Sequence, residues 1–450
     1  MIHTRTSRLA ALLWVTVTTA VAFGQASPFP GQDEKAIYDR LLPQIEQIKI
    51  WDNHGHPGWP DDGDVDAMAS PPGEAEALRV RGDNAELVAA SKALFGYPYA
   101  DLSEEHQKWL IAKKEELRKQ QPGAAYFARI LDQVGIQTAA ANRVAMPDYL
   151  DPARFRWVFF VDNFMFPFDN RLLRDRNTDE QVYIPLQEKV LKRNMQQAGI
   201  NGLPPDLTGY EKFVSRILEQ DQQKGAIAEK FEAAYFRPNG LNFLDPPRER
   251  AAAIYSKYRA GGVPTPDEYR DFQDYIFRYL VREGGRLHLS VHIHTAVGIG
   301  DYFNLSEGNV MQLENVLRDP RYSDVTFVLL HGGYPYERQA IWLAARKNVY
   351  LDSSLIELFL YPTEFKHTLK EWLEVFPDKI VFGSDAFPFN AALGAEESYW
   401  LAVTSARTSL AAALAEMISA GEISEARALE FAHNYLHDTA AHLYESRGTK

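Results

Sequence analysis

The residues Asp52-Asn53-His54-Gly55-His56 close a predicted strand that begins at Ile48. Three later segments also end a predicted strand with a metal-ligand residue type: Val291-His292-Ile293-His294, Leu329-Leu330-His331 and Gly383-Ser384-Asp385. Histidines and an aspartate that meet at the carboxyl ends of parallel strands are typical of a divalent-metal site at the mouth of a β/α barrel. We therefore predict an α/β protein with a (β/α)8 TIM-like barrel.

The rest of the chain supplies the strands for such a barrel. Short apolar runs alternate with longer helical stretches, as in parallel strands joined by helices, and no long repeat suggests a solenoid or propeller. The predicted strands number eight, which closes a barrel. They lie near Ile48–Asp52, Ile136–Ala141, Arg156–Val161, Ala226–Tyr235, Leu287–His294, Thr326–His331, Val349–Asp352 and Ile380–Phe382.

Uneven strand spacing predicts helical insertions after strands 1 and 3, at about residues 57–134 and 163–225. Helices are expected there at Glu104–Lys119, Leu186–Ala198 and Tyr210–Gln222, and closing helices at Glu396–Ala420 and Ile423–Ser446. Insertions after barrel strands lie on the catalytic face, where they form a lid or a pocket wall. Residues 27–450 are predicted to form one barrel domain.

The first 26 residues have the pattern of a secretory signal peptide. Arg5 and Arg8 precede the apolar stretch Leu9–Phe23, and Gly24-Gln25-Ala26 supplies small residues for cleavage. A retained N-terminal anchor is the alternative. We expect a periplasmic or secreted bacterial protein, in which the absence of cysteine excludes disulfides.

The amino-acid composition limits which molecules and metal ions the protein is expected to bind. A net charge of −13 makes the chain a poor ligand for nucleic acids or anionic membranes, and no later segment is apolar for long enough to predict a membrane span. Twelve histidines and no cysteine favour nitrogen and oxygen ligands, with Zn expected first and Mn or Fe as alternatives. We expect a small-molecule substrate, and a homo-oligomer stays open.

The alternation of side chains along a strand indicates which histidines are expected to face the metal site. His54 and His56 share one face, with Ile48 and Ile50 expected to fill the barrel below them; a surface loop with two unrelated histidines is the alternative. His294 stands at the upper rim of its strand and is the expected ligand. His292, one layer deeper, is either a hydrogen-bond partner of the site or a core histidine, and His288 is expected to be structural.

His331 and Asp385 follow buried strands and are predicted site residues. His331 precedes Gly332-Gly333, which allows a tight turn, although capping or packing would also explain this histidine. A carboxylate at a buried strand end is costly unless it is paired or binds metal. Asp385 is therefore predicted to be a metal ligand and proton acceptor, with a helix N-cap as the alternative.

Lys230 is unexpected inside a strand. Its face is shared with Ala226, Ala228, Glu232 and Ala234, whose mostly small side chains leave room for an inward lysine. A salt bridge to Glu232 or Asp385 would neutralise it. Reaction with CO2 would instead give a carbamate that bridges two metal ions, and the sequence does not choose between these.

Asn142 and two arginines are candidates for substrate binding. Asn142-Arg143 follow strand 2 and Arg237 follows strand 4, where they could hold an anionic substrate because a guanidinium binds carboxylates, although surface salt bridges are the default for such residues. The aromatic run Phe159–Phe168 after strand 3 is expected to pack the barrel.

These segments resemble the amidohydrolase superfamily, and within it the amidohydrolase-2 branch, over roughly Ile48 to Pro388. The stretches His294-Thr295 with Gly298-Ile299-Gly300-Asp301, and His331-Gly332-Gly333-Tyr334-Pro335 with Tyr350-Leu351-Asp352, are similar to amidohydrolase domains fused to glutamine-synthetase-like proteins. The family pattern maps its metal and catalytic residues onto His54, His56, His294, His331 and Asp385. Lys230 would match the carboxylated lysine of binuclear members, which mononuclear decarboxylases of the family lack.

The resemblance implies a hydrolase with one or two metal ions. His54, His56 and Asp385 would hold one ion, and Lys230 with His294 a second; Asp385 would accept the proton of the attacking water, and His331 would orient the scissile group. We predict cleavage of a C–N amide or a related ester or lactone bond. A mononuclear decarboxylase or carbon–carbon lyase is the enzymatic alternative, and a non-catalytic metal- or ligand-binding barrel is the alternative from another class.

Overall fold

The computed structural model describes residues 33–64, 77–176, 178, 180–295, 298, 303–388, 390 and 392–445. The predicted signal peptide, residues 1–26, lies outside these described residues, and so do Ile299, Gly300 and Asp301 of the segment after His294.

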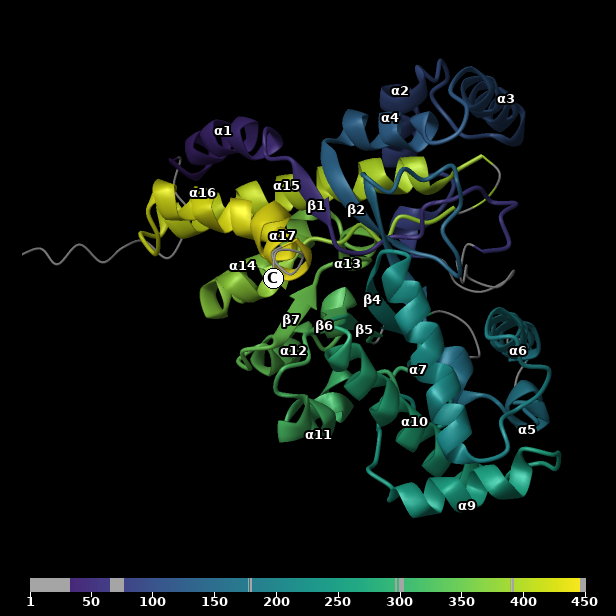
Figure 1. The fold of residues 1–450 in the computed structure, drawn as a ribbon. Coiled ribbons are helices and arrows are strands. Elements are labelled where there is room, and N and C mark those ends of the chain that lie inside the picture. Colours follow the sequence, from purple (N-terminus) through teal and green to yellow (C-terminus); the bar gives the residue numbers. More distant parts are fainter. Residues whose placement is uncertain are drawn as a thin grey trace, which may run out of the picture.

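Eight parallel strands, ordered β1 to β8 along the sheet, form the predicted barrel (Figure 1). Each predicted strand is present with shifts of a few residues at its ends, and the largest shift is in β4, which ends at Phe231 because Ala233–Phe236 turn into a short helix. The strands are β1 Ile50–Asp52, β2 Ile136–Asn142, β3 Phe155–Phe160, β4 Ala226–Phe231, β5 Ser290–His294, β6 Phe327–Leu330, β7 Val349–Asp352 and β8 Ile380–Val381.

Helices surround this sheet and fill both long insertions. The first insertion contains η1 Leu78–Val80, α2 Ala85–Phe95, α3 Glu104–Gln120 and α4 Ala125–Val134, and the second contains η2 Asp162–Met165, α5 Arg171–Arg174, α6 Glu180–Gln197 and α7 Leu207–Gln223. The others are α1 Asp33–Glu46, α8 Ala233–Phe236, α9 Arg248–Tyr258, α10 Pro266–Arg286, η3 Val310–Leu313, α11 Glu314–Leu317, η4 Pro320–Tyr322, η5 His331–Gly333, α12 Glu337–Leu343, α13 Ile356–Phe359, α14 Pro362–Val375, η6 Pro377–Lys379, α15 Ala395–Ser419, α16 Glu425–His433, η7 Asn434–Asp438 and α17 Thr439–Tyr444.

The barrel interior has its own small apolar core, separate from the larger core under the helices. Trp51, Ala140, Val158, Ala228 and Val328 are among the strand residues that form it. The expectation that Ile48 and Ile50 fill the barrel is wrong, because both belong to the outer core. The register between β1 and β2 shifts between Ile50 and Trp51, and Trp51 is the β1 residue of the interior core.

The C-terminal elements complete the barrel where β1 and β8 meet. A single helix predicted over Ile423–Ser446 is wrong: α16, the π-helical turn η7 and α17 occupy this region. The η7 turn lies against both β1 and β8, and its Tyr435 carbonyl accepts a hydrogen bond from Phe382 N at 3.0 Å. Leu443 of α17 is buried in the interior core, and Tyr444 stacks on Trp51 with 4.7 Å between ring centroids.

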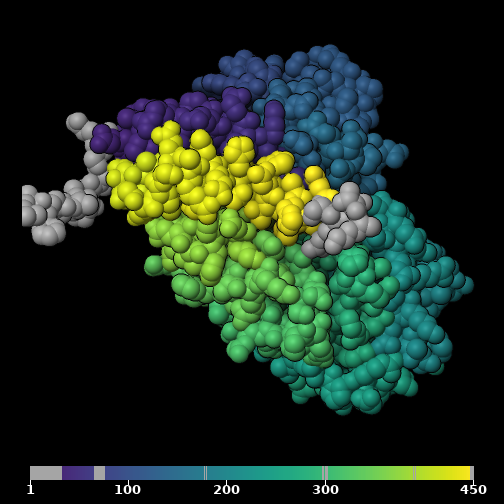
Figure 2. All heavy atoms as spheres, turned by 60° about the vertical axis from the view of Figure 1, so that its left-hand side comes forward, coloured from purple at the N-terminus to yellow at the C-terminus, as the bar shows by residue number. Residues whose placement is uncertain are grey.

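The first described helix, α1, lies against the C-terminal helices. Figure 2 shows the C-terminal helices in yellow against the N-terminal helix α1 in purple, and Arg40 of α1 pairs with Glu425 of α16 at 3.0 Å. By length and composition α15 could cross a membrane, and it is the one described helix that could. However, 67% of its most apolar window is buried within the fold, as expected of a core helix.

Leu443→Ala tests whether the packing of α17 against the interior core stabilises the barrel. Removing a buried leucine side chain leaves a cavity and is expected to lower the free energy of unfolding by about 2–5 kcal/mol, measured by urea denaturation. Leu186→Ala, at a leucine that is 41% exposed on α6, is the matched control and should change it by less than about 0.5 kcal/mol. Equal effects of both substitutions would contradict this stabilising role of α17.

Candidate metal centre

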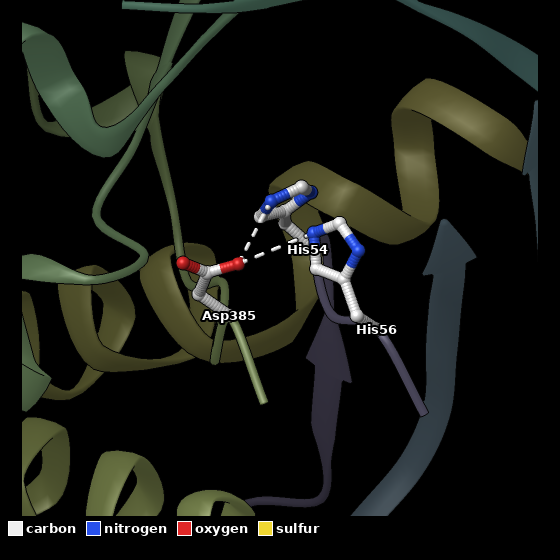
Figure 3. Close-up of side chains that lie close together, drawn as sticks. All are labelled: His54, His56 and Asp385. Carbon is white, nitrogen blue, oxygen red and sulfur yellow. Dashed lines mark ion pairs between the residues drawn. The ribbon is translucent and has the colours of Figure 1, made fainter. Parts of the chain in front are cut away.

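Three side chains meet at the carboxyl ends of β1 and β8. Asp385 Oδ1 lies 3.1 Å from His54 Nε2 and 3.5 Å from His56 Nε2. One potential ligand atom from each residue lies within 4.8 Å of the others, and all three residues are buried. Figure 3 shows both imidazoles turned toward the carboxylate, and the remaining carboxylate oxygen pointing away from them.

Backbone hydrogen bonds between the ends of β1 and β8 bring these side chains together. The carbonyl of His54 accepts hydrogen bonds from Ser384 N at 3.0 Å and Asp385 N at 2.7 Å, and His56 N donates to the carbonyl of Ala386 at 2.7 Å. Asp385 adopts a φ of +45°, a conformation that costs a non-glycine residue energy and is concentrated at functional sites. The seam between the first and last strands therefore sets the geometry of the cluster.

A buried carboxyl group lies beneath this seam. Asp52 Oδ1 accepts hydrogen bonds from Ser384 N at 2.8 Å and His54 N at 3.2 Å, and Asp52 Oδ2 accepts one from Ser384 Oγ at 2.6 Å. Burial raises the pKa of Asp52 to about 8, although the hydrogen bonds from Ser384 and His54 act in the opposite direction. Asp52 thus ties His54 to the residue that precedes Asp385.

The cluster fits a divalent ion. Burial lowers the pKa of His54 and of His56 well below the usual value, which keeps both imidazoles in the neutral form that binds metals. His54 Nε2 is buried and has no hydrogen-bond partner in the described part of the chain. Two imidazoles and a carboxylate form a three-residue nitrogen and oxygen set of the kind that catalytic zinc sites use.

Two more predicted residues, His331 and His294, form a hydrogen-bonded pair next to the cluster. The His331 ring centroid lies 5.2 Å from that of His54, and His331 Nε2 lies 2.9 Å from His294 Nδ1. His331 Nδ1 is 2.9 Å from Ser354 Oγ, and burial lowers the pKa of His331 to about 4. His331 has a φ of +61°, so two site residues have a left-handed backbone conformation. His294 is placed beside His331 and is outside the three-residue ligand cluster.

Hydrogen bonds connect His331 to the C-terminal helix α17 through three intervening residues. Ser354 N donates to Asp352 Oδ1 at 2.8 Å, and Asn53 Nδ2 donates to Asp352 Oδ2 at 2.7 Å. The Tyr444 hydroxyl donates to Asn53 Oδ1 at 2.5 Å and lies 2.7 Å from His292 Nε2. Because the hydroxyl hydrogen is used by Asn53, His292 must donate its Nε2 proton to Tyr444.

Lys230 points into the barrel interior, close to the histidines. Its Nζ is fully buried and lies 3.3 Å from Glu232 Oε1, the salt bridge that was one of two expectations for this lysine. After burial, the charge of Lys230 is the next contribution that lowers the pKa of His54 and of His292. Lys230 is outside the three-residue cluster.

The two arginines predicted to bind substrate have partners within the protein. Arg143 is fully buried, pairs with Asp62 at 2.5 Å and donates to the carbonyl of Pro57 at 2.9 Å. Arg237 is also fully buried and pairs with Asp274 of α10. Both arginines thus have structural ion pairs in the folded chain.

Several residues shape the site in ways that the sequence did not predict. Asn142, expected with Arg143 to hold an anionic substrate, lies at the end of β2 and contacts His54 Nδ1 through its amide at 2.8 Å, and its Oδ1 is buried without a partner in the described residues. Asp52 was visible only as the first residue of the Asp-Asn-His-Gly-His segment, and Asp352 as the end of a strand. No local pattern predicts that Tyr444, 391 residues after Asn53, reaches this network.

Tyr444→Phe tests the connection from α17 to the site. Loss of the hydroxyl leaves Asn53 Oδ1 and His292 Nε2 without their shared partner, so the free energy of unfolding should fall by about 1–3 kcal/mol in urea denaturation. Tyr361→Phe, at a tyrosine that is 40% exposed, is the matched control and should have almost no effect. An unchanged stability of Tyr444→Phe would show that the network contributes little.

Comparison with known protein families and curated proteins identifies proteins that are similar to this chain. The amidohydrolase family model, Amidohydro_2, matches residues 222–445, which include β4 to β8. Protein fluG of Emericella nidulans is 30% identical over 157 residues, which are 34% of this chain. The match spans only 17% of the length of that protein.

Solved structures share the fold over nearly the whole chain. A protein named as a metal-dependent hydrolase from Lactobacillus casei superposes with a TM-score of 0.59 at 18% identity, covering 91% of this chain and 99% of that chain. Uronate isomerase from Thermotoga maritima gives 0.60 at 13% identity, covering 92% and 99%. Glucuronate isomerase from Caulobacter crescentus gives 0.57 at 12% identity, covering 94% and 97%. The family match shows that residues 222–445, with β4 to β8, belong to the amidohydrolase family, and the solved structures, all below 25% identity, share the barrel fold.

Proposed function

We propose that the protein is a metal-dependent hydrolase that cleaves a C–N amide, or a related ester or lactone bond, of a small molecule. The observation that carries the proposal is the buried cluster of His54, His56 and Asp385 at the carboxyl ends of the barrel strands. Active sites of β/α barrels lie at this end. A divalent ion held by these three residues, with Zn expected before Mn or Fe, would lower the pKa of a bound water toward neutrality.

The residues around the cluster suit proton handling. Asp385 directs one oxygen at both imidazoles, so its other oxygen is available to take a proton from water and return it to the leaving group. His331 is neutral at neutral pH, and its Nδ1 is held near Ser354. His331 can therefore orient the neighbouring His294 through its Nε2 without adding a positive charge of its own.

A single-metal lyase is the second candidate, and one observation favours it. Lys230 is paired with Glu232 at 3.3 Å, and an amine held in a salt bridge is not a metal ligand, which supports one ion rather than two. By the family resemblance, decarboxylases with one metal have no lysine ligand, so the chemistry could break a carbon–carbon bond instead. The predicted signal peptide, and with it an exported location, supports hydrolysis over catabolism of aromatic acids.

Metal analysis and Asp385→Asn test the proposed reaction together. The purified protein is expected to contain a divalent ion by elemental analysis, and the metal-loaded protein to turn over members of a panel of chromogenic amides, esters and lactones. Asp385→Asn removes a ligand and the proton acceptor, so turnover should fall by about a hundredfold or more.

Asp324→Asn, at an aspartate that is 97% exposed, is the matched control and should keep both metal and activity. A protein that binds no metal after reconstitution, or an Asp385→Asn variant with full activity, would contradict the hydrolase proposal. Release of CO2 from a carboxylated ring, without hydrolysis of the panel, would instead support the lyase.

Lys230→Ala tests the number of ions. Because Lys230 pairs with Glu232, the variant should keep the same metal content per chain as the unmodified protein, measured by elemental analysis. Lys108→Ala, at an exposed lysine of α3, controls for loss of a positive charge. Loss of one ion, with partial rescue by short carboxylic acids, would indicate that Lys230 is carboxylated and that the site holds two.

A further inference from the structure

A cavity of about 430 Å³ lies between α5, the segment after α8 and the N-terminal half of α10. Its wall is largely apolar and includes Leu172, Leu173, Pro238 and Tyr269, and Arg270 and Gln273 of α10 add polar groups. None of the metal-cluster residues lines it. We propose that this cavity is a second binding site, separate from the metal centre, that takes a small organic carboxylate with an apolar body.

Buried hydrogen-bond donors without partners support this proposal. Gln273 is 2% exposed, and its Nε2 has no hydrogen-bond partner within the described ranges of the chain. The buried Nε of Arg270 has none either. Burying a donor without an acceptor costs about 1–3 kcal/mol, so such groups normally have a partner, whether protein, water or ligand. A bound acceptor would satisfy both side chains that line the cavity.

Arg237 lies behind the cavity wall and does not line the cavity. It immediately precedes Pro238 in the chain, is fully buried and pairs with Asp274, the residue after Gln273 on α10. Of the side chains that do line the cavity, Arg270 and Gln273 each leave a donor without a partner among the described residues, which calls for a ligand that accepts hydrogen bonds.

The charges favour an anion over a cation. The acidic residues on the wall, Asp169 and Asp267, already pair with Arg171 at 2.6 Å and with Arg270 at 3.3 Å. Neither carboxylate is thus left to bind a cation alone. The cavity also lies at the N-terminal end of the 21-residue helix α10, where the helix dipole favours negative charge. Guanidinium groups bind carboxylates with paired hydrogen bonds.

The volume and the apolar wall of the cavity indicate which kind of anion it would bind. A volume of about 430 Å³ is within the range of small-molecule sites, which combine an apolar lining with a few polar groups. Inorganic phosphate would leave the leucine and proline side chains without contacts. A carboxylate attached to a ring or a short hydrocarbon chain would fill the space and reach the donors of α10.

Benzoate is the probe for a binding test by isothermal titration with the metal-loaded, full-length protein. We expect saturable binding that survives removal of the metal by a chelator, because the cavity shares no residue with the metal centre. Gln273→Leu and Arg270→Met should each weaken benzoate about tenfold, since each removes a hydrogen bond to a charged ligand. Arg282→Met, at an exposed arginine on the same helix, should bind as the unmodified protein does.

A pair of substitutions at Leu172 keeps the test independent of folding. Leu172 lines the cavity and is 51% exposed, so the fold should tolerate Leu172→Glu and Leu172→Gln alike. Leu172→Glu should weaken benzoate by charge repulsion, whereas Leu172→Gln should weaken it less. Benzyl alcohol, which has the same ring without the charge, should bind more weakly than benzoate.

Three results would overturn the proposal. Benzoate affinity that is unchanged in Gln273→Leu, Arg270→Met and Leu172→Glu would exclude this cavity as the binding site. Loss of benzoate binding on chelation would assign the anion to the metal centre instead. Inorganic phosphate that binds as tightly as benzoate would reject an organic acid as the ligand class. The test does not need turnover, so its outcome is distinct from that of the hydrolase proposal.

Discussion

The site depends on the hydrogen bonds that join the ends of β1 and β8. One carbonyl, that of His54, accepts from the backbone of both Ser384 and Asp385, and the Asp52 carboxyl group holds Ser384 through its backbone and its hydroxyl. These contacts fix the two imidazoles of β1 against the carboxylate that follows β8. They also close a barrel whose first and last strands would otherwise be sheet edges, with unpaired backbone groups.

The C-terminal elements and the first insertion support this seam from two sides. The η7 turn lies against β1 and β8. Tyr444 of α17 joins His292 to Asn53, so the C-terminal helix contacts the residues directly below the metal-binding side chains. The first insertion is tied to α15, which follows the Asp385 segment. Lys114 of α3 pairs with Glu397 at 2.7 Å, and Tyr126 of α4 donates to Glu396 at 2.6 Å.

The sequence predicted the architecture well because strand and helix periodicity are local properties. Eight buried apolar runs, each followed by a turn and a helical stretch, were enough to predict the barrel, and the strand ends differ by only a few residues. Predicting the face of a side chain from strand alternation failed where the regular alternation of the strand is interrupted or ends. Parity placed Ile50 in the interior, but Ile50 belongs to the outer core and Trp51 to the interior core, so the alternation does not continue unbroken from Ile50 to His54, and β4 ends before Ala234.

What the sequence determined by itself is the fold class and the residue types at the strand ends, since hydrophobic pattern and strand order need no knowledge of distant contacts. Only the tertiary structure decided which of these residues meet. His54 and Asp385 are 331 residues apart and become neighbours because a barrel brings its first and last strands together. It likewise placed His294 beside His331, paired Lys230 with Glu232 and gave Arg143 and Arg237 internal partners. Such pairings depend on side-chain direction and on burial, which are set by packing rather than by any local pattern.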